Sequence, residues 1–183
     1  MILINMINTF KAINIPEDKK PIVICDIDLT FIRPIYDYND VYHRLKSHFS
    51  DPIELDIAVN FQVKRDVNIY INLGLVKQTD KDGFLQMLDK INQLGGKFLF
   101  LTARSSFYHE KTISDLKQAG LQNPDEFEIH YTGNLITKGD YIQKHSLLNG
   151  YDHHIFIDDY PSFLESALKI YPDMNCYLFK HDK

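Results

Sequence analysis

The segment IVICDIDLT, residues 22–30, decides the fold, because an apolar run ends there in two acidic side chains, Asp26 and Asp28. A second apolar run, IFI, leads in the same way into Asp158 and Asp159. Continuous β-branched and aromatic runs of this length are typical of strands covered on both faces, as in parallel α/β sheets. Ligands of such sheets bind beyond the carboxyl ends of the strands. The four carboxylates therefore mark the predicted site.

Gathering four carboxylates in one place is energetically expensive. Two unit charges about 4 Å apart repel by roughly 4 kcal/mol at an effective dielectric constant near 20. A divalent cation removes this cost, and oxygen ligands beside a substrate phosphate are the usual setting for Mg²⁺. The sequence therefore predicts Mg²⁺ as cofactor and a metal-assisted phosphate chemistry.

The composition argues against a disulfide-rich protein and against a protein with a broad nucleic-acid surface. The chain has 183 residues, 44 % of them hydrophobic and 25 % charged, which is ordinary for a globular domain with a modest insertion. Two cysteines, Cys25 and Cys176, make no disulfide framework. The formal net charge of -5 disfavours a broad nucleic-acid surface, so we expect a small phosphorylated substrate.

The amino-terminal segment, residues 1–15, is apolar but short. It lacks a basic flank and a small-residue cleavage site, so we expect a docking helix here and not a signal peptide. Because no export or membrane signal is recognised, we expect a cytoplasmic protein with no membrane partner.

The order of the remaining elements alternates between strands and helices. A capping box from Thr79 to Asp82 precedes one helix, and Ser105 or Ser106 can cap another that runs to Gly120. This order predicts an α/β fold: an open, Rossmann-like parallel sheet with helices on both faces. The expected strands are 22–25, 98–101, 128–131, 155–157 and, at one edge, 176–179; further helices are expected at 140–148 and 162–170.

The longest interval between the candidate site residues follows the first strand. Seventy-six positions separate Asp26 from Thr102, against thirty-six from Thr102 to Lys138 and twenty from there to Asp158. We therefore expect a small, mainly helical cap at 31–78, inserted into a core formed by 1–30 and 79–183. Six residues of the cap are candidates for substrate contact, and an ordinary surface or packing role is the alternative for each. They are Arg33, Tyr36, Tyr38, Tyr42, His43 and Arg44.

The spacing of Asp26 and Asp28 suits two chemical roles. Alternate residues of an extended backbone project to the same side, so one carboxylate can attack phosphorus while the other transfers protons. The attack would give an aspartyl-phosphate. A D-x-D-x-T string is also common in strand-end turns, where such aspartates only cap loops.

Three further segments can contact a phosphate. Thr102 ends a strand, so its hydroxyl and the following backbone N–H of Ala103 can hold phosphate oxygens. Lys138 offers a cation at another helix entrance, although a solvated lysine is the ordinary alternative. Arg104 can reach phosphate or a substrate carboxylate, or it is a surface arginine at a helix start.

These pieces in this order resemble the haloacid dehalogenase-like (HAD) superfamily, whose phosphatases carry D-x-D-x-T, a strand-end Thr or Ser, a Lys and an acidic pair. The resemblance extends from about Pro21 to Ser162. It implies a Rossmann-like core and the following roles: Asp26 as nucleophile and metal ligand, Asp28 as acid/base with its backbone carbonyl on Mg²⁺, Asp158 as metal ligand, and Thr102 and Lys138 as phosphate ligands.

Two positions of the resemblance carry further expectations. Asp159 is implied to be a metal ligand or a neighbour that orients Lys138 or a metal-bound water. Leu29 stands where these phosphatases frequently have glycine, so we expect the turn to form without a positive φ.

The leading hypothesis is a Mg²⁺-dependent phosphomonoester hydrolase that acts through an aspartyl-phosphate on a small metabolite or nucleotide. The alternatives are a phosphatase for nucleic-acid ends and a non-catalytic binding module with the same fold. Retention of Lys138 and of both carboxylate pairs favours the enzyme.

Overall fold

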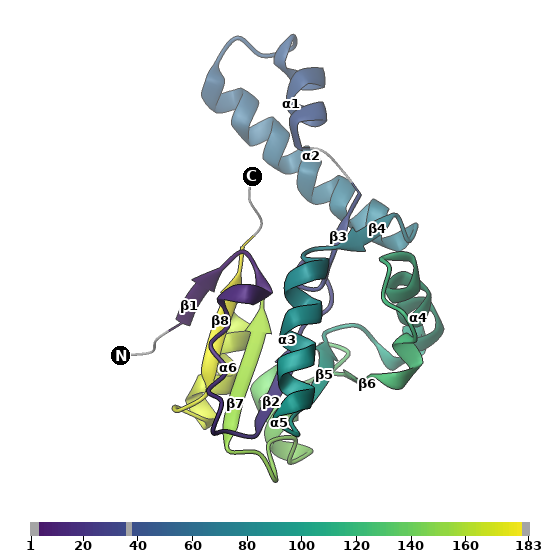
Figure 1. Ribbon diagram of the computed structural model, residues 1–183. Coiled ribbons are helices and arrows are strands. Elements are labelled where there is room, and N and C mark those ends of the chain that lie inside the picture. The colour runs from purple at the N-terminus through teal and green to yellow at the C-terminus, as the bar shows by residue number, and fades with distance from the viewer. Residues whose placement is uncertain (1–3, 36–37, 181–183) are drawn as a thin grey trace.

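The computed structural model describes residues 4–35 and 38–180, and its centre is a six-stranded sheet in the order β1-β8-β7-β2-β5-β6. Every neighbouring pair of strands in this sheet is parallel, which confirms the predicted α/β, Rossmann-like class (Figure 1). The strands are β1 (Ile4–Ile7), β2 (Pro21–Cys25), β5 (Lys97–Thr102), β6 (Glu128–Tyr131), β7 (His153–Asp158) and β8 (Asn175–Phe179).

Helices cover both faces of the sheet. The α3 helix (Lys81–Gln93), the α4 helix (His109–Gln118) and the short η1 helix (Phe10–Ala12) pack into one apolar cluster, and Figure 1 shows α3 in front of the strands. The α5 helix (Lys138–Lys144) and the α6 helix (Pro161–Ile170) pack into a second cluster on the opposite face. The strands between these layers are buried on both sides, which is why their sequences are continuously apolar.

The position of the central strand, β2, determines where a ligand is expected to bind. All five of its residues are buried. The chain continues from β2 to β5 and β6 on one side, and then returns to β7 and β8 on the other. The strand order therefore reverses beside β2, and the crevice at its carboxyl end is where open α/β sheets bind ligands.

The long interval after β2 forms a separate outgrowth. It contains β3 (Ile32–Pro34), α1 (Tyr38–Lys46), α2 (Pro52–Asn72) and β4 (Val76–Gln78), with β3 and β4 paired antiparallel. The two helices share a small apolar cluster of their own, around Val41, Leu55 and Val59. They project beyond the ribbon of β3 and β4, away from the main sheet (Figure 1).

The expectation of an amino-terminal docking helix is wrong. Ile4–Ile7 forms the strand β1, which pairs in parallel with β8 from Ile4 opposite Cys176 to Ile7 opposite Phe179. The expected edge strand at 176–179 is therefore an inner strand. An open edge exposes unpaired backbone groups, and a short apolar segment is well suited to cover it.

The start of α3 also differs from the expected capping box. The N-cap is Asp80, because the backbone N–H of Thr79 donates to the carbonyl of Phe31 instead. The Asp80 carboxylate accepts from the N–H of Gly83 at 2.9 Å and from the N–H of Phe10 at 2.9 Å. One side chain thus caps α3 and fastens the segment that follows β1.

The backbone of the turn after Asp28 differs from the expectation. We expected this turn to form without a positive φ, but Leu29 has φ = 59°. The backbone N–H groups of Phe31 and Ile32 both donate to the carbonyl of Ile27, at 3.0 and 2.9 Å. These bonds hold Leu29 in a left-handed conformation that costs an L-residue roughly 1–2 kcal/mol.

We expect Leu29→Gly to change the free energy of unfolding by less than about 1 kcal/mol, because relief of the positive φ offsets the loss of the half-buried side chain. The volume-matched change Leu29→Ile should lower it by about 1 kcal/mol or more, since β-branched residues tolerate this region least. Urea denaturation of the three proteins measures both changes. A Leu29→Ile protein as stable as the starting protein would contradict this account of the turn.

Candidate active site

Three carboxylates meet at the carboxyl ends of β2 and β7. One oxygen from each of Asp26, Asp158 and Asp159 lies within 4.8 Å of the others. The strand register explains the meeting, because Cys25 lies opposite Ile157, so the next residues of the two strands, Asp26 and Asp158, lie side by side. The N–H of Asp26 donates to the carbonyl of Ile157 at 2.9 Å and fixes this junction.

The Lys138 ammonium lies between two of these carboxylates. Its Nζ donates to Oδ1 of Asp26 at 2.5 Å and to Oδ2 of Asp158 at 2.7 Å, and the side chain is 0 % exposed. Lys138 is the first residue of α5, which begins two residues earlier than expected, with Thr137 as N-cap. Gly139 allows α5 to pack closely against α6, because a Cβ at this position would lie 2.2 Å from the carbonyl oxygen of Ser166.

Burial dominates the electrostatics of the cluster. Desolvation, with the charges of Asp158 and Asp28 adding to it, raises the pKa of Asp26 to about 7. Desolvation and the charge of Asp26 likewise raise the pKa of Asp159 to about 7. Burial alone would lower the pKa of Lys138, but Asp26 and Asp158 outweigh it and raise that pKa. When all three carboxylates are ionised, the single ammonium of Lys138 leaves two negative charges of the cluster uncompensated.

The carboxylate of Asp28 has a different partner from that of Asp26. It accepts two hydrogen bonds from Arg104, from Nε to Oδ2 at 2.8 Å and from Nη2 to Oδ1 at 2.6 Å. The Asp28 side chain remains 31 % exposed, whereas Arg104 is mostly buried. Arg104, predicted as a phosphate or substrate contact, thus binds a carboxylate of the protein itself.

The predicted phosphate-binding residues Thr102 and Ala103 lie at the end of β5, directly beside β2. Thr102 is buried, and its Oγ1 accepts from the backbone N–H of Arg104 at 3.2 Å. Ala103, the residue between Thr102 and Arg104 in the sequence, is half-buried. The ends of β2, β5 and β7 therefore carry the predicted residues side by side along one edge of the sheet.

A model of the HAD superfamily, subfamily IIIB (Acid phosphatase), matches residues 2–149, which is most of the chain. The chain belongs to this family. Membership confirms the predicted superfamily and the predicted enzyme class, a hydrolase acting on phosphoric monoesters. A search of the curated proteins found no match.

The family match of this HAD phosphatase ends before Asp158 and Asp159. The place of Asp158 and Asp159 beside Asp26 is therefore known from the structure alone, in which β7 pairs with β2. No helix within the described part of the chain is long and apolar enough to cross a membrane.

The residues expected in the cap belong to the outgrowth that contains β3 and α1. Arg33 belongs to β3, opposite Lys77, and its buried Nε has no hydrogen-bond partner among the described residues. Tyr42, His43 and Arg44 are in α1, which Tyr38 begins, and Tyr36 lies outside the described residues.

The sequence analysis of this phosphatase missed Asp115. Its carboxylate is buried and accepts from Arg104 Nη1 at 2.8 Å and from Lys111 Nζ at 2.8 Å. One signal was available, because Thr112 and Asp115 lie on the same helix face as Ile113 and Leu116, which is the buried face of α4. A carboxylate on a buried face requires cationic partners.

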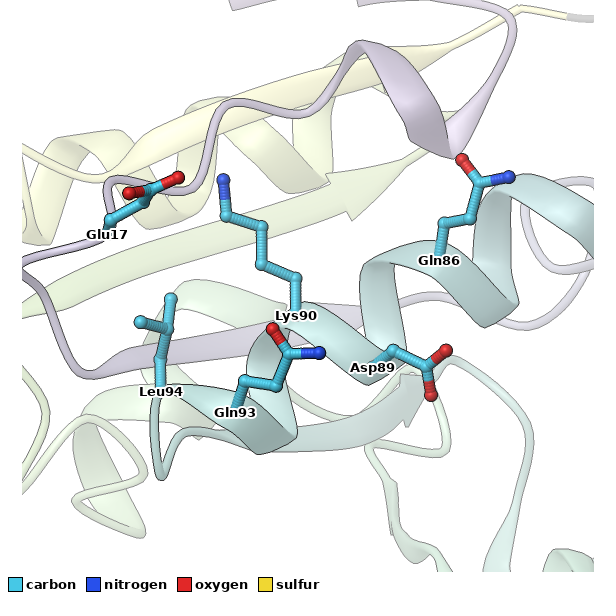
Figure 2. A pocket seen from close by; sticks show the side chains of 6 residues that line it. All are labelled: Glu17, Gln86, Asp89, Lys90, Gln93 and Leu94. Atoms are coloured by element: carbon cyan, nitrogen blue, oxygen red, sulfur yellow. The ribbon is translucent and has the colours of Figure 1, made fainter.

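A groove of about 590 Å³ lies on the outer side of α3, against the segment before β2. Figure 2 shows Lys90 rising from the helix towards Glu17 across this groove. Its lining residues are Glu17, Gln86, Asp89, Lys90, Gln93 and Leu94. None of the predicted catalytic residues lines this groove.

Proposed function

We propose that this HAD phosphatase is a Mg²⁺-dependent phosphomonoesterase that acts through an aspartyl-phosphate on a small phosphorylated metabolite or nucleotide. The observation that carries the proposal is the buried cluster of Asp26, Asp158 and Asp159 with a single ammonium, that of Lys138. When its three carboxylates are ionised, the cluster has two uncompensated negative charges, which one divalent cation would balance.

The donor set of this cluster fits Mg²⁺. It offers carboxylate oxygens, which hard divalent cations prefer, and it contains no thiolate or imidazole. The side chains of Asp26, Asp158 and Asp159 would hold the ion, with the backbone carbonyl of Asp28 as a further ligand. When bound, Mg²⁺ would neutralise the acidic cluster and stabilise negative charge on the phosphoryl oxygens.

The residues of the chain supply the remaining chemistry. The Asp26 carboxylate attacks phosphorus, and the bond from phosphorus to the leaving oxygen breaks as Asp28 protonates that oxygen. Asp28 then accepts a proton from the water that attacks the aspartyl-phosphate, which releases phosphate and restores Asp26. Lys138, Thr102 and the N–H of Ala103 hold the phosphoryl oxygens during both steps.

Hydrolysis of p-nitrophenyl phosphate tests this proposal. We expect turnover with Mg²⁺, loss of turnover with excess chelator and recovery when Mg²⁺ is returned. Acid quenching during turnover should trap one phosphoryl group on the peptide that contains Asp26, detected by mass spectrometry. Turnover that survives the chelator would overturn the metal requirement, and a phosphoryl group on another residue would overturn the nucleophile.

The outgrowth at 31–78 is proposed to be the cap that controls access to this site. Support comes from its place in the chain, since β3 begins four residues after Asp28 and α1 and α2 follow it at the same end of the sheet (Figure 1). The core would then consist of 1–30 and 79–183.

The metal-free protein should lose stability as the pH rises. Asp26 and Asp159 have pKa values of about 7 in the folded state, against roughly 4 when unfolded. Between these values the folded state binds more protons than the unfolded state, so the free energy of unfolding falls with increasing pH. We expect Asp159→Asn to have a smaller decrease between pH 5 and pH 8, measured by urea denaturation in chelator.

Comparing variants at each pH cancels the titration of groups that they share, including the histidines. Asp173→Asn, which changes an exposed carboxylate before β8, should follow the starting protein. Mg²⁺ should stabilise the starting protein more at pH 8 than at pH 5, because protons compete for its ligands. Equal pH dependence in Asp159→Asn and Asp173→Asn would show that the cluster does not titrate in this way.

A further inference from the structure

A second charged cluster lies behind Asp28, on α4. Asp115, with a side chain only 2 % exposed, accepts from Arg104 Nη1 at 2.8 Å and from Lys111 Nζ at 2.8 and 3.0 Å. Thr112 Oγ1 also accepts from Arg104 Nη1, at 3.1 Å. One buried carboxylate therefore holds two cations in place.

Arg104 joins this cluster to the candidate active site. Its guanidinium uses Nε and Nη2 for Asp28, and Nη1 for Asp115 and Thr112. Because the guanidinium is planar and is bound on both sides, it has little freedom to rotate. The position of the Asp28 carboxylate thus depends on what holds the far side of Arg104.

Lys111 extends the network to the outgrowth. Its Nζ donates to the carbonyl of Ile71, in the last turn of α2, at 2.9 Å. The charges of Asp28, Arg104, Asp115 and Lys111 alternate in sign along this path. A continuous series of charge-assisted hydrogen bonds therefore connects the end of α2 with Asp28.

We propose that Asp115 and Lys111 are positioning residues for the phosphatase reaction: they fix Arg104, and Arg104 fixes the Asp28 carboxylate for proton transfer. This inference rests on the proposed role of Asp28 as acid/base. A carboxylate has about four lone-pair sites, so the two bonds from Arg104 leave sites on both oxygens for a proton. Asp28 is also the member of the Asp28–Arg104–Asp115 path that remains substantially exposed, at 31 %.

The argument for positioning comes from the energetics of buried ion pairs. Such pairs contribute little net stability, because the cost of desolvation offsets their attraction. Residues that orient a functional side chain, in contrast, commonly change activity by about 10–100-fold when they are replaced. Asp115 has the contacts of an orienting residue, because it binds the guanidinium that holds Asp28, and Lys111 in turn binds Asp115.

The test uses two esters that differ in their need for protonation of the leaving oxygen. p-Nitrophenolate leaves without a proton, whereas the alkoxide of β-glycerophosphate requires one. We expect Asp115→Asn and Lys111→Gln to lower kcat/KM for β-glycerophosphate by about 10–100-fold, because kcat/KM reports only the steps up to departure of the alcohol and not the hydrolysis of the aspartyl-phosphate that both esters share. The kcat/KM for p-nitrophenyl phosphate should fall by less than about 3-fold in the same preparations.

The ratio of the two kcat/KM values is the decisive quantity, because a misfolded fraction lowers both values equally and cancels. Lys117→Gln is the matched control, since Lys117 is on the same helix but is 57 % exposed and pairs with Asp125. We expect its ratio to equal that of the starting protein. Equal losses for both esters in Asp115→Asn and Lys111→Gln would overturn the proposal.

A double-mutant comparison separates this proposal from the proposed function. In an Asp28→Asn background, Asp115→Asn and Lys111→Gln should change the ratio no further, because their effect acts through Asp28. Additive changes would overturn the inference. If Asp28→Asn alone leaves the ratio unchanged, the acid/base role itself fails; if it shifts the ratio and the other two variants do not, only the positioning role fails.

Discussion

Asp26→Asn is expected to lower kcat for p-nitrophenyl phosphate by at least about 10⁴-fold, because an amide cannot act as the nucleophile. The replacement is close to isosteric, and its remaining oxygen can still accept from Lys138, which contacts Asp26 at 2.5 Å. The effect should therefore be catalytic and not a loss of folding. Initial rates at saturating Mg²⁺ measure it, and thermal denaturation confirms that the variant is folded.

Asp18→Asn provides a control for this experiment, since Asp18 is exposed in the turn before β2. Its rate should stay within about 2-fold of that of the starting protein, as is usual for surface substitutions that touch no functional group. An Asp26→Asn protein with a rate within about 10-fold of the starting protein would exclude the covalent route through Asp26.

Lys138→Met is expected to lower the free energy of unfolding by about 3–5 kcal/mol in metal-free buffer at pH 8. The change removes the cation that both Asp26 and Asp158 contact and leaves two buried carboxylates without it. Activity with Mg²⁺ should fall by at least about 100-fold, since the ammonium also stabilises charge on the transferred phosphoryl group. Urea denaturation and initial rates give the two values.

Lys144→Met is the matched variant, because Lys144 is an exposed lysine at the other end of the same helix. Its stability should change by less than about 0.5 kcal/mol. The loss in Lys138→Met should also be smaller at pH 6, where protonation removes part of the repulsion between Asp26 and Asp158. Equal midpoints for Lys138→Met and Lys144→Met would refute the account of a buried ion cluster.

The sequence predicted the sheet, and the meeting of acidic side chains at the carboxyl ends of its strands, for a physical reason. Strands buried on both faces require continuous apolar runs. The residues directly before Asp26 and before Asp158 form such runs. Parallel neighbours then bring the residues after them together. This rule predicted the positions of Asp26, Asp158 and Asp159, whereas the place of Lys138 beside them followed from the resemblance to the HAD superfamily.

Other features depend on contacts that spacing does not encode. The partner of Arg104 on α4, Asp115, is a tertiary contact of a helix that the sequence analysis treated only as a cover for the sheet. The left-handed Leu29 depends on the hydrogen bonds that the turn makes around it. The strand at Ile4–Ile7 depends on an open sheet edge that only the complete order of strands reveals.

The pairing of β1 with β8 sets an order of events during synthesis on the ribosome. The first strand of the sheet pairs with β8, so it cannot take its place until residues 175–179 have been translated. Until then this apolar amino-terminal segment has no partner strand, and the nascent chain must be kept from associating through it. Closing the sheet is therefore a late event, which joins the earliest and latest translated strands.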